Sequence, residues 1–107
     1  EKHKLRSALI VSGIGMLEDP ALGYFDGEKY RDKKLKGCYE LVAMHGSIAG
    51  GNIHIHVALG DEKCGTKSGH LLRAKVKVQN ELVIQRLDEI ELSRVAKGKL
   101  KVLGFEG

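Results

Sequence analysis

The chain has 107 residues, of which 42% are hydrophobic and 30% are charged, so it has enough apolar material for one core and too little for two. Eighteen Lys and Arg against fourteen Asp and Glu give a net charge of +4. No apolar run approaches the ~20 residues that a membrane-spanning helix needs, and no secretory leader is evident. We therefore expect residues 1–107 to form a single cytoplasmic domain without membrane contact.

The N-terminal third of the chain predicts short elements separated by polar segments. Residues 8–11 form a short apolar strand. The SGIG segment at 12–15 is typical of a tight glycine turn, after which a strand resumes at 21–25. Residues 27–36 are polar and read as a connection.

The rest of the chain predicts strands at regular spacing. The segments 39–47, 52–59, 71–78 and 81–87 read as four successive strands, with a Gly-Gly pair, a GDEKCG loop and a Gln-Asn pair between them. The basic tail at 97–107 is expected to be a short strand or a loop. These segments predict a sheet built mainly from sequential antiparallel strands.

The histidines of the central region form a candidate metal site. In an extended strand alternate side chains share a face, so His54 and His56 lie on one face of their strand. His70 follows a polar loop that lets the chain turn back beside that strand. Three neutral imidazoles are a recurring zinc ligand set and also suit copper, nickel and iron, whereas the simpler interpretation is a polar strand face.

Other candidate groups each have two interpretations. Glu40 either orients a metal-binding histidine from the second coordination sphere or is an ordinary ion-paired or edge-exposed side chain. His45 is expected to be a partly buried structural residue, with a fourth ligand as the alternative. Cys64 lies between His56 and His70 and is a weaker alternative as a thiolate ligand. Cys38 and Cys64 have no CxxC spacing, and we expect no disulfide between them.

Five segments carry a family resemblance when they are taken in order. They are SGIGML at 12–17, LGYFD at 22–26, YELVAMHGSI at 39–48, IHIHVAL at 53–59 and GHLL at 69–72. Together they resemble the plants-and-prokaryotes-conserved (PPC) domain over about Ser7 to Arg94.

The resemblance implies a fold, an assembly and a ligand. The fold is an α/β (α+β) domain with a mainly antiparallel sheet and few helices, and the assembly is a homotrimer. In prokaryotic members, histidines at the positions of His54, His56 and His70 are associated with a divalent metal. Plant members carry the domain next to AT-hook segments that bind DNA, and this sequence contains no AT-hook core. Residues 1–6 resemble only the end of the family's first helix, and we expect the usual first strand to be missing, which would leave a sheet edge unpaired.

The basic residues have a structural and a nucleic-acid interpretation. Three of them alternate with apolar residues, as on a strand with one wet face: Arg73, Lys75 and Lys77. Further clusters occur at 33–36 and 97–101, but acidic residues are interspersed and aromatic residues are few. Solvated strand faces explain this pattern better than a DNA footprint does, so any DNA binding should be weak.

Three classes of function remain after these arguments. The first is a metal-binding trimeric module that recognises a small molecule or a protein. The second is a DNA-associated protein, as the family resemblance suggests. The third is a zinc enzyme, in which the metal activates water and a carboxylate such as Glu40 handles the proton. We favour the first, because no general acid or base stands out in the sequence.

Overall fold

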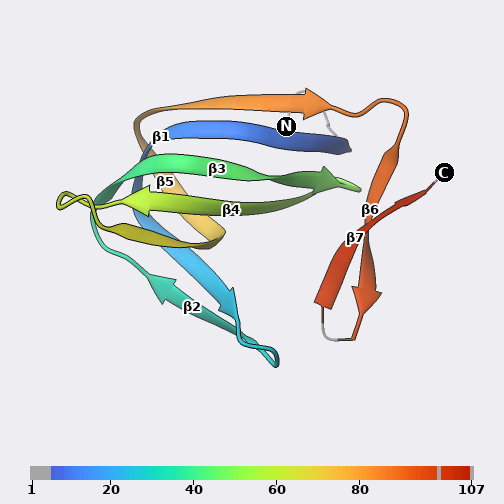
Figure 1. The fold of residues 1–107 in the computed structure, drawn as a ribbon, viewed down its shortest axis with the longest axis horizontal. Helices are drawn as coiled ribbons and strands as arrows, with labels where there is room; N and C mark the ends of the chain where they lie inside the picture. Colours follow the sequence, from blue (N-terminus) through green and yellow to red (C-terminus); the bar gives the residue numbers. More distant parts are fainter. Residues whose placement is uncertain (1–5, 99, 107) are drawn as a thin grey trace.

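The computed structural model describes residues 6–98 and 100–106, which form seven β-strands (Figure 1). They are β1 (Ser7–Phe25), β2 (Tyr30–Lys34), β3 (Cys38–Ala49), β4 (Asn52–Gly60), β5 (Thr66–Arg86), β6 (Glu91–Lys97) and β7 (Leu100–Glu106). No helix occurs among these described residues, so the expected α/β class is wrong and the fold is all-β and antiparallel. The expected helix remnant at 1–6 lies, except for Arg6, outside the described residues.

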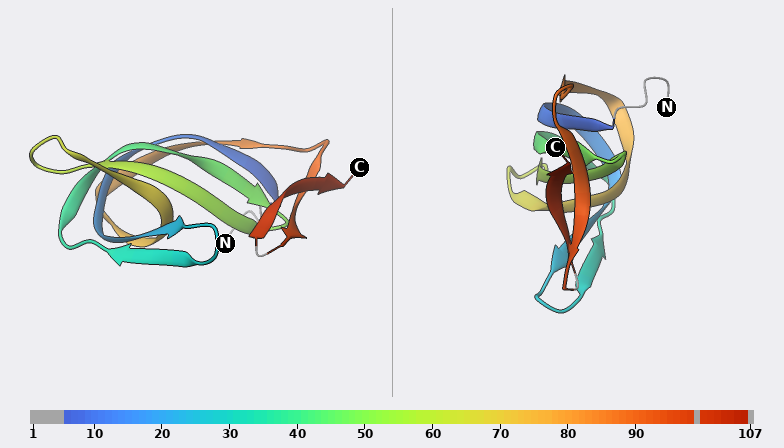
Figure 2. Two further views of the ribbon diagram at one scale, coloured as in Figure 1. Left: turned by 60° about the horizontal axis from the view of Figure 1, so that its bottom comes forward. Right: turned by 90° about the vertical axis from the view of Figure 1, so that its right-hand side faces the viewer.

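Strands β1 to β5 form one sheet in the order β2-β1-β3-β4-β5, and β1 pairs with β5 as well. Each of β1, β3, β4 and β5 therefore has a partner on both sides, and these four strands close into a ring. The open edge expected from a missing strand is not seen at β1. Strands β6 and β7 form a separate hairpin beside one end of the ring (Figure 2).

The interior of the ring is filled by inward-facing residues of its strands and by Leu35 from the β2–β3 connection. The buried cluster consists of Ile10, Leu17, Leu22, Leu35, Leu41, Met44, Val57 and Leu59, with Ile55 packed against it. Because Ile55, Val57 and Leu59 face the interior, the alternating residues His54 and His56 lie on the outer face of β4.

The expected glycine turn at 12–15 is wrong, because β1 continues through it without interruption. The glycines serve close packing. A Cβ on Gly13 would lie 2.9 Å from atoms of Met44 and Leu82, and a Cβ on Gly15 would collide with Asn80 and the Gln79 carbonyl. At this point β5 pairs closely with β1, and the pairing shifts register on both sides of Gly13–Gly15 and again between Glu18 and Leu22.

The strands expected at 71–78 and 81–87 are two halves of β5. The break between them is a local bend, at which Val78 has a φ of 68°. The Asn80 side-chain carbonyl accepts a hydrogen bond of 3.1 Å from the Met16 N–H and so fixes the bend to β1.

The expected polar connection at 27–36 contains β2, which has all five residues exposed and so no apolar alternation to reveal it. The strands expected at 39–47 and 52–59 are confirmed, and the strand alternative for the tail is confirmed as β7. The described residues hold no helix with the length and hydropathy needed to cross a membrane.

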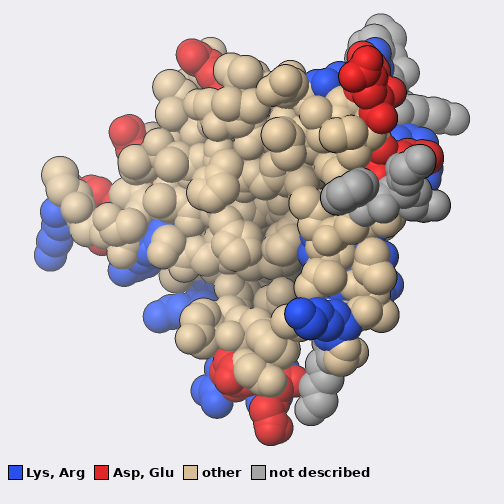
Figure 3. Space-filling view, turned by 45° about the vertical axis from the view of Figure 1, so that its right-hand side comes forward, with Lys and Arg blue, Asp and Glu red and all other residues tan. Residues whose placement is uncertain are grey.

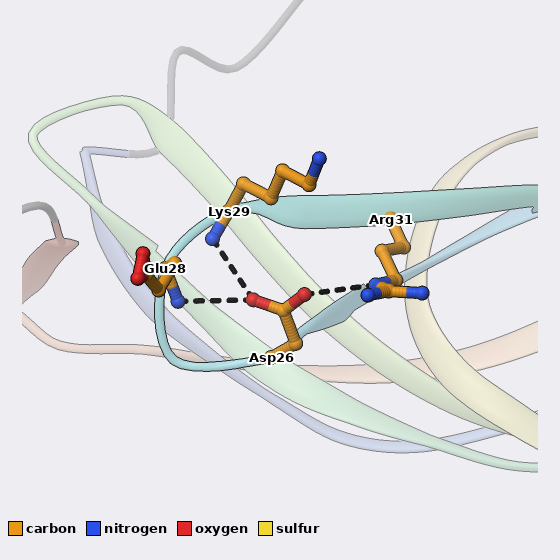
Figure 4. Close-up of polar contacts among 4 residues, drawn as sticks. All are labelled: Asp26, Glu28, Lys29 and Arg31. Atoms are coloured by element: carbon orange, nitrogen blue, oxygen red, sulfur yellow. Dashed lines mark hydrogen bonds and ion pairs between the residues drawn. The ribbon is translucent and has the colours of Figure 1, made fainter.

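The turn between β1 and β2 is organised by one carboxylate (Figure 4). Asp26 Oδ1 accepts hydrogen bonds of 3.0 Å from the N–H groups of Glu28 and Lys29, and Oδ2 accepts one of 2.8 Å from Arg31 Nε. The bonds from the Lys29 N–H, from Arg31 and from the Glu28 N–H lower the pKa of Asp26. This turn sets where Tyr30 lies at the start of β2.

Candidate metal centre

Three histidines from β4 and β5 come together on the outer face of the sheet. His56 pairs directly with His70 across the two strands, and His54 lies on the same face of β4. One ring nitrogen from each of the three lies within 4.8 Å of the other two. His54 Nε2 and His56 Nε2 are 3.2 Å apart. The predicted proximity of His70 to the other two histidines is therefore present in the structure.

The loop between β4 and β5 sets the register that creates this cluster. Asp61 Oδ1 accepts hydrogen bonds from the N–H groups of Lys63 and Gly65, at 2.9 and 2.7 Å, and closes a tight turn. The pairing that begins at Gly60 and Thr66 then runs without a bulge to His56 and His70. A shift of one residue would move His70 to the opposite face of β5.

Strand β3 supports the cluster from the other side of β4. Gly46 lies where a Cβ would collide with the carbonyl oxygen of His54 and would sit 2.9 Å from Ile55 Cα. The absence of a side chain at Gly46 thus lets β3 approach the backbone that carries His54.

The electrostatic environment favours neutral imidazoles. Partial burial lowers the pKa of His54 below its usual 6.5, and the charges of His70, Arg94 and His56 lower it further. Burial, His56 and Arg94 lower the pKa of His70 in the same way. Neutral imidazole is the form that binds metals, so both residues keep a free lone pair near pH 7.

The Nδ1 atom of His70 is buried and has no hydrogen-bond partner among the described residues. A buried polar atom of this kind normally has a partner, which can be an ion. For comparison, two nitrogens bound tetrahedrally to one zinc ion at 2.0–2.1 Å lie about 3.4 Å apart, close to the separation of His54 and His56. The donor atoms present therefore fit a divalent metal.

Two cavities flank the cluster. One, of about 390 Å³, is bounded by Tyr30, Asn52, Ile53, His54, His70, Arg94, Leu100 and Lys101. The other, of about 380 Å³, shares Tyr30 and His70 and adds His56 and Ser68. The Tyr30 ring meets the His70 ring edge-on, with centroids 5.7 Å apart. Figure 3 shows the surface hollowed between the β6–β7 hairpin and the β1–β2 hairpin.

Glu40 and the two cysteines lie away from the three histidines. Glu40 is exposed and pairs with Gly60, four residues or about 13 Å along β4 from His56, so the structure does not bring it to the cluster. Cys64 is exposed in the loop beyond that pair, and Cys38 is also exposed and free.

His45 is exposed, contrary to the partly buried position expected for it. A bulge between Leu41 and Ala43 reverses the alternation of β3, so that Met44 faces the core and His45 faces outward. His45 lies directly opposite His56, yet it does not belong to the group of three.

Sequence reasoning missed two neighbours of the site, Tyr30 and Arg94. Each comes from a strand that the sequence did not predict, β2 and β6 respectively. Neither strand shows a strong alternation of apolar and polar residues. The only available signal was Tyr30, an aromatic residue in a polar segment.

The sequence profile of the Plants and Prokaryotes Conserved (PCC) domain matches residues 1–88. The chain belongs to this family. A Pyrococcus horikoshii plant- and prokaryote-conserved (PPC) protein of known crystal structure is 33% identical, with a TM-score of 0.88 over 96% of this chain and 76% of that protein. No curated protein matches the chain significantly.

Two further solved structures of the PCC fold are relevant to function. A metal-containing protein from Archaeoglobus fulgidus is 26% identical, with a TM-score of 0.82 over 96% of this chain and 76% of that protein. A candidate DNA-binding protein from Ralstonia eutropha is 28% identical, with a TM-score of 0.81 over 94% of this chain and 74% of that protein. The chain thus spans about three quarters of the length of these proteins.

Proposed function

We propose that this PCC-domain protein binds one divalent metal ion per chain through His54, His56 and His70, with zinc as the leading candidate. The observation that carries the proposal is the convergence of three imidazoles within 4.8 Å, one of them with a buried and unpartnered Nδ1. The existence of a metal-containing relative of the same fold supports it.

We further propose that the metal centre belongs to a non-catalytic binding or regulatory module in the cytoplasm. A zinc enzyme would need a proton-transferring group beside the metal. The carboxylate considered for that role, Glu40, pairs with Gly60 at a distant position of the strand. The two cavities beside the histidines instead offer room for a small ligand.

A homotrimer is part of the same proposal. Several large apolar side chains remain exposed on β1 and β5, where Val11 is 53% and Val83 is 58% exposed. Exposed apolar surface of this kind is characteristic of subunit contacts.

Elemental analysis of the purified protein tests the metal proposal. After expression in metal-replete medium and exhaustive dialysis, we expect close to one zinc ion per chain. His56→Ala should reduce the content to below about a tenth. His45→Ala is the matched control, because His45 lies opposite His56 on the same face but outside the cluster, and it should keep a full complement. Full metal content in a triple His54, His56 and His70 alanine variant would refute the proposal.

Weak DNA binding is the second candidate function. Arg73, Lys75 and Lys77 are all exposed along β5, and a relative of this fold is a candidate DNA-binding protein. A short row of cations would contact the phosphates of DNA but would not recognise the base edges, so the binding would not depend on sequence.

A further inference from the structure

The wall of the larger cavity facing the histidines is positively charged. Arg94 of β6 and Lys101 of β7 both line it, together with His54 and His70. Lys101 pairs with Ala96, two residues from Arg94, so the two cationic residues share one face of the hairpin.

Arg94 is held in place by two contacts of the hairpin. Its Nη2 donates a hydrogen bond of 2.7 Å to the Lys101 carbonyl, which fixes the guanidinium relative to β7. The hairpin itself is anchored by Leu92, which is buried and donates its N–H to Ser7 Oγ at 2.9 Å. The remaining guanidinium N–H groups form the planar donor fork that suits carboxylate and phosphate oxygens.

This positive charge has no counterpart within the described part of the chain. None of the described residues lining the cavity is acidic, and neither Arg94 nor Lys101 forms an ion pair among them. A divalent metal on the three histidines would add two further positive charges without adding a carboxylate. Such a concentration of cations is stabilised when an anion enters.

We propose that this cavity binds a small organic anion through a carboxylate or phosphate group, held by Arg94 and Lys101 next to the histidines. The inference deepens the proposed function, on which it rests for the metal. The volume of about 390 Å³ suits a small molecule. Tyr30 and Asn52, which also line the cavity, carry a hydroxyl and an amide that hydrogen-bond oxyanions.

Calorimetric titration of the zinc-loaded protein with malonate and with inorganic phosphate tests the proposal and separates the two anion classes. We expect saturable binding of at least one probe. Arg94→Gln should weaken it at least tenfold while the zinc content stays at one per chain. Lys97→Gln is the matched control, because Lys97 is an exposed cation of β6 that does not line the cavity, and it should bind like the unmodified protein.

A second variant guards against a folding defect, since Arg94 also bonds to β7. Lys101→Gln leaves the Arg94 bond to the Lys101 carbonyl available and should weaken binding as well. The inference would be overturned, even with zinc present, if neither probe binds. It would also be overturned if both variants bind with the affinity of the unmodified protein. If the protein takes up no zinc, the metal proposal fails on its own. The same titrations of metal-free protein then decide whether Arg94 and Lys101 bind the anion.

Discussion

At the scale of single residues, the state of the site depends on imidazole protonation. The fold holds the pKa values of His54 and His70 below 6.5, mainly through burial. The unfolded chain therefore binds these protons more readily than the folded chain does. For the metal-free protein, the free energy of unfolding should be highest above pH 6.5 and should fall as the pH drops below it.

Urea unfolding of the metal-free protein at pH 7.5, 6.5 and 5.5 measures this dependence. We expect a progressive fall in the midpoint concentration as the pH decreases. The double variant His54→Gln with His70→Gln is the control and should lose most of the fall. An unmodified protein that is equally stable at pH 7.5 and 5.5 would contradict the pKa directions. In the zinc-loaded protein, acidification should also release the metal, because protons compete for the same nitrogens.

At the scale of elements, the cluster depends on the close approach of β3 to β4. We predict that Gly46→Ala destabilises the protein by about 1–3 kcal/mol, because its Cβ would meet the His54 backbone. Displacing that backbone should also weaken zinc binding. Gly23→Ala is the control, since its Cβ would make ordinary contacts of 3.5 Å with Leu72 and Tyr30. Equal stability of the two variants would show that the strands can move apart freely.

A second prediction at this scale concerns the bend of β5. Val78 is a β-branched residue with a φ of 68°, a conformation in which such residues are strained. It is also 87% exposed, so its side chain contributes little packing. Val78→Asn should raise the free energy of unfolding by about 1 kcal/mol, because Asn tolerates this conformation. Val76→Asn, on the same strand without a positive φ, should bring no gain. A loss of stability at position 78 would contradict the assignment of strain.

The elements also show how far the sequence alone could be taken. Apolar segments bounded by turn residues predicted β3 and β4. The alternation of side chains along β4 correctly placed His54 and His56 on one face of that strand. Such patterns could not predict β2, whose residues are all exposed, or the contribution of Arg94 from β6. The bulge in β3 could not be predicted either, because it has no sequence signature. Its one extra residue turns His45 from the inner to the outer face of the strand.

At the scale of the whole molecule, the exposed apolar residues and the basic row lead to separate predictions. Light scattering at micromolar concentration should give about three times the chain mass of 11.7 kDa, as the proposed trimer requires. Val83→Lys should lower that mass, because Val83 belongs to the exposed apolar surface of β5. A monomeric mass for the unmodified protein would contradict the trimer.

DNA binding should be weak, independent of sequence and lost in salt. Arg73, Lys75 and Lys77 can neutralise only a few phosphates, and the affinity of such contacts falls steeply as counterions are added. AT-rich and GC-rich duplexes titrated at low and at physiological salt should therefore behave alike. Tight and selective binding at physiological salt would place the DNA function ahead of the metal module.

The central claim is that one metal ion is held by His54, His56 and His70, and anomalous diffraction from crystals of the zinc-loaded protein tests it most directly. Data recorded on both sides of the zinc absorption edge should give one strong peak per chain, at about 2.0–2.1 Å from a ring nitrogen of each of the three histidines. A peak bound elsewhere, or none at these histidines in protein shown to contain zinc, would contradict the claim.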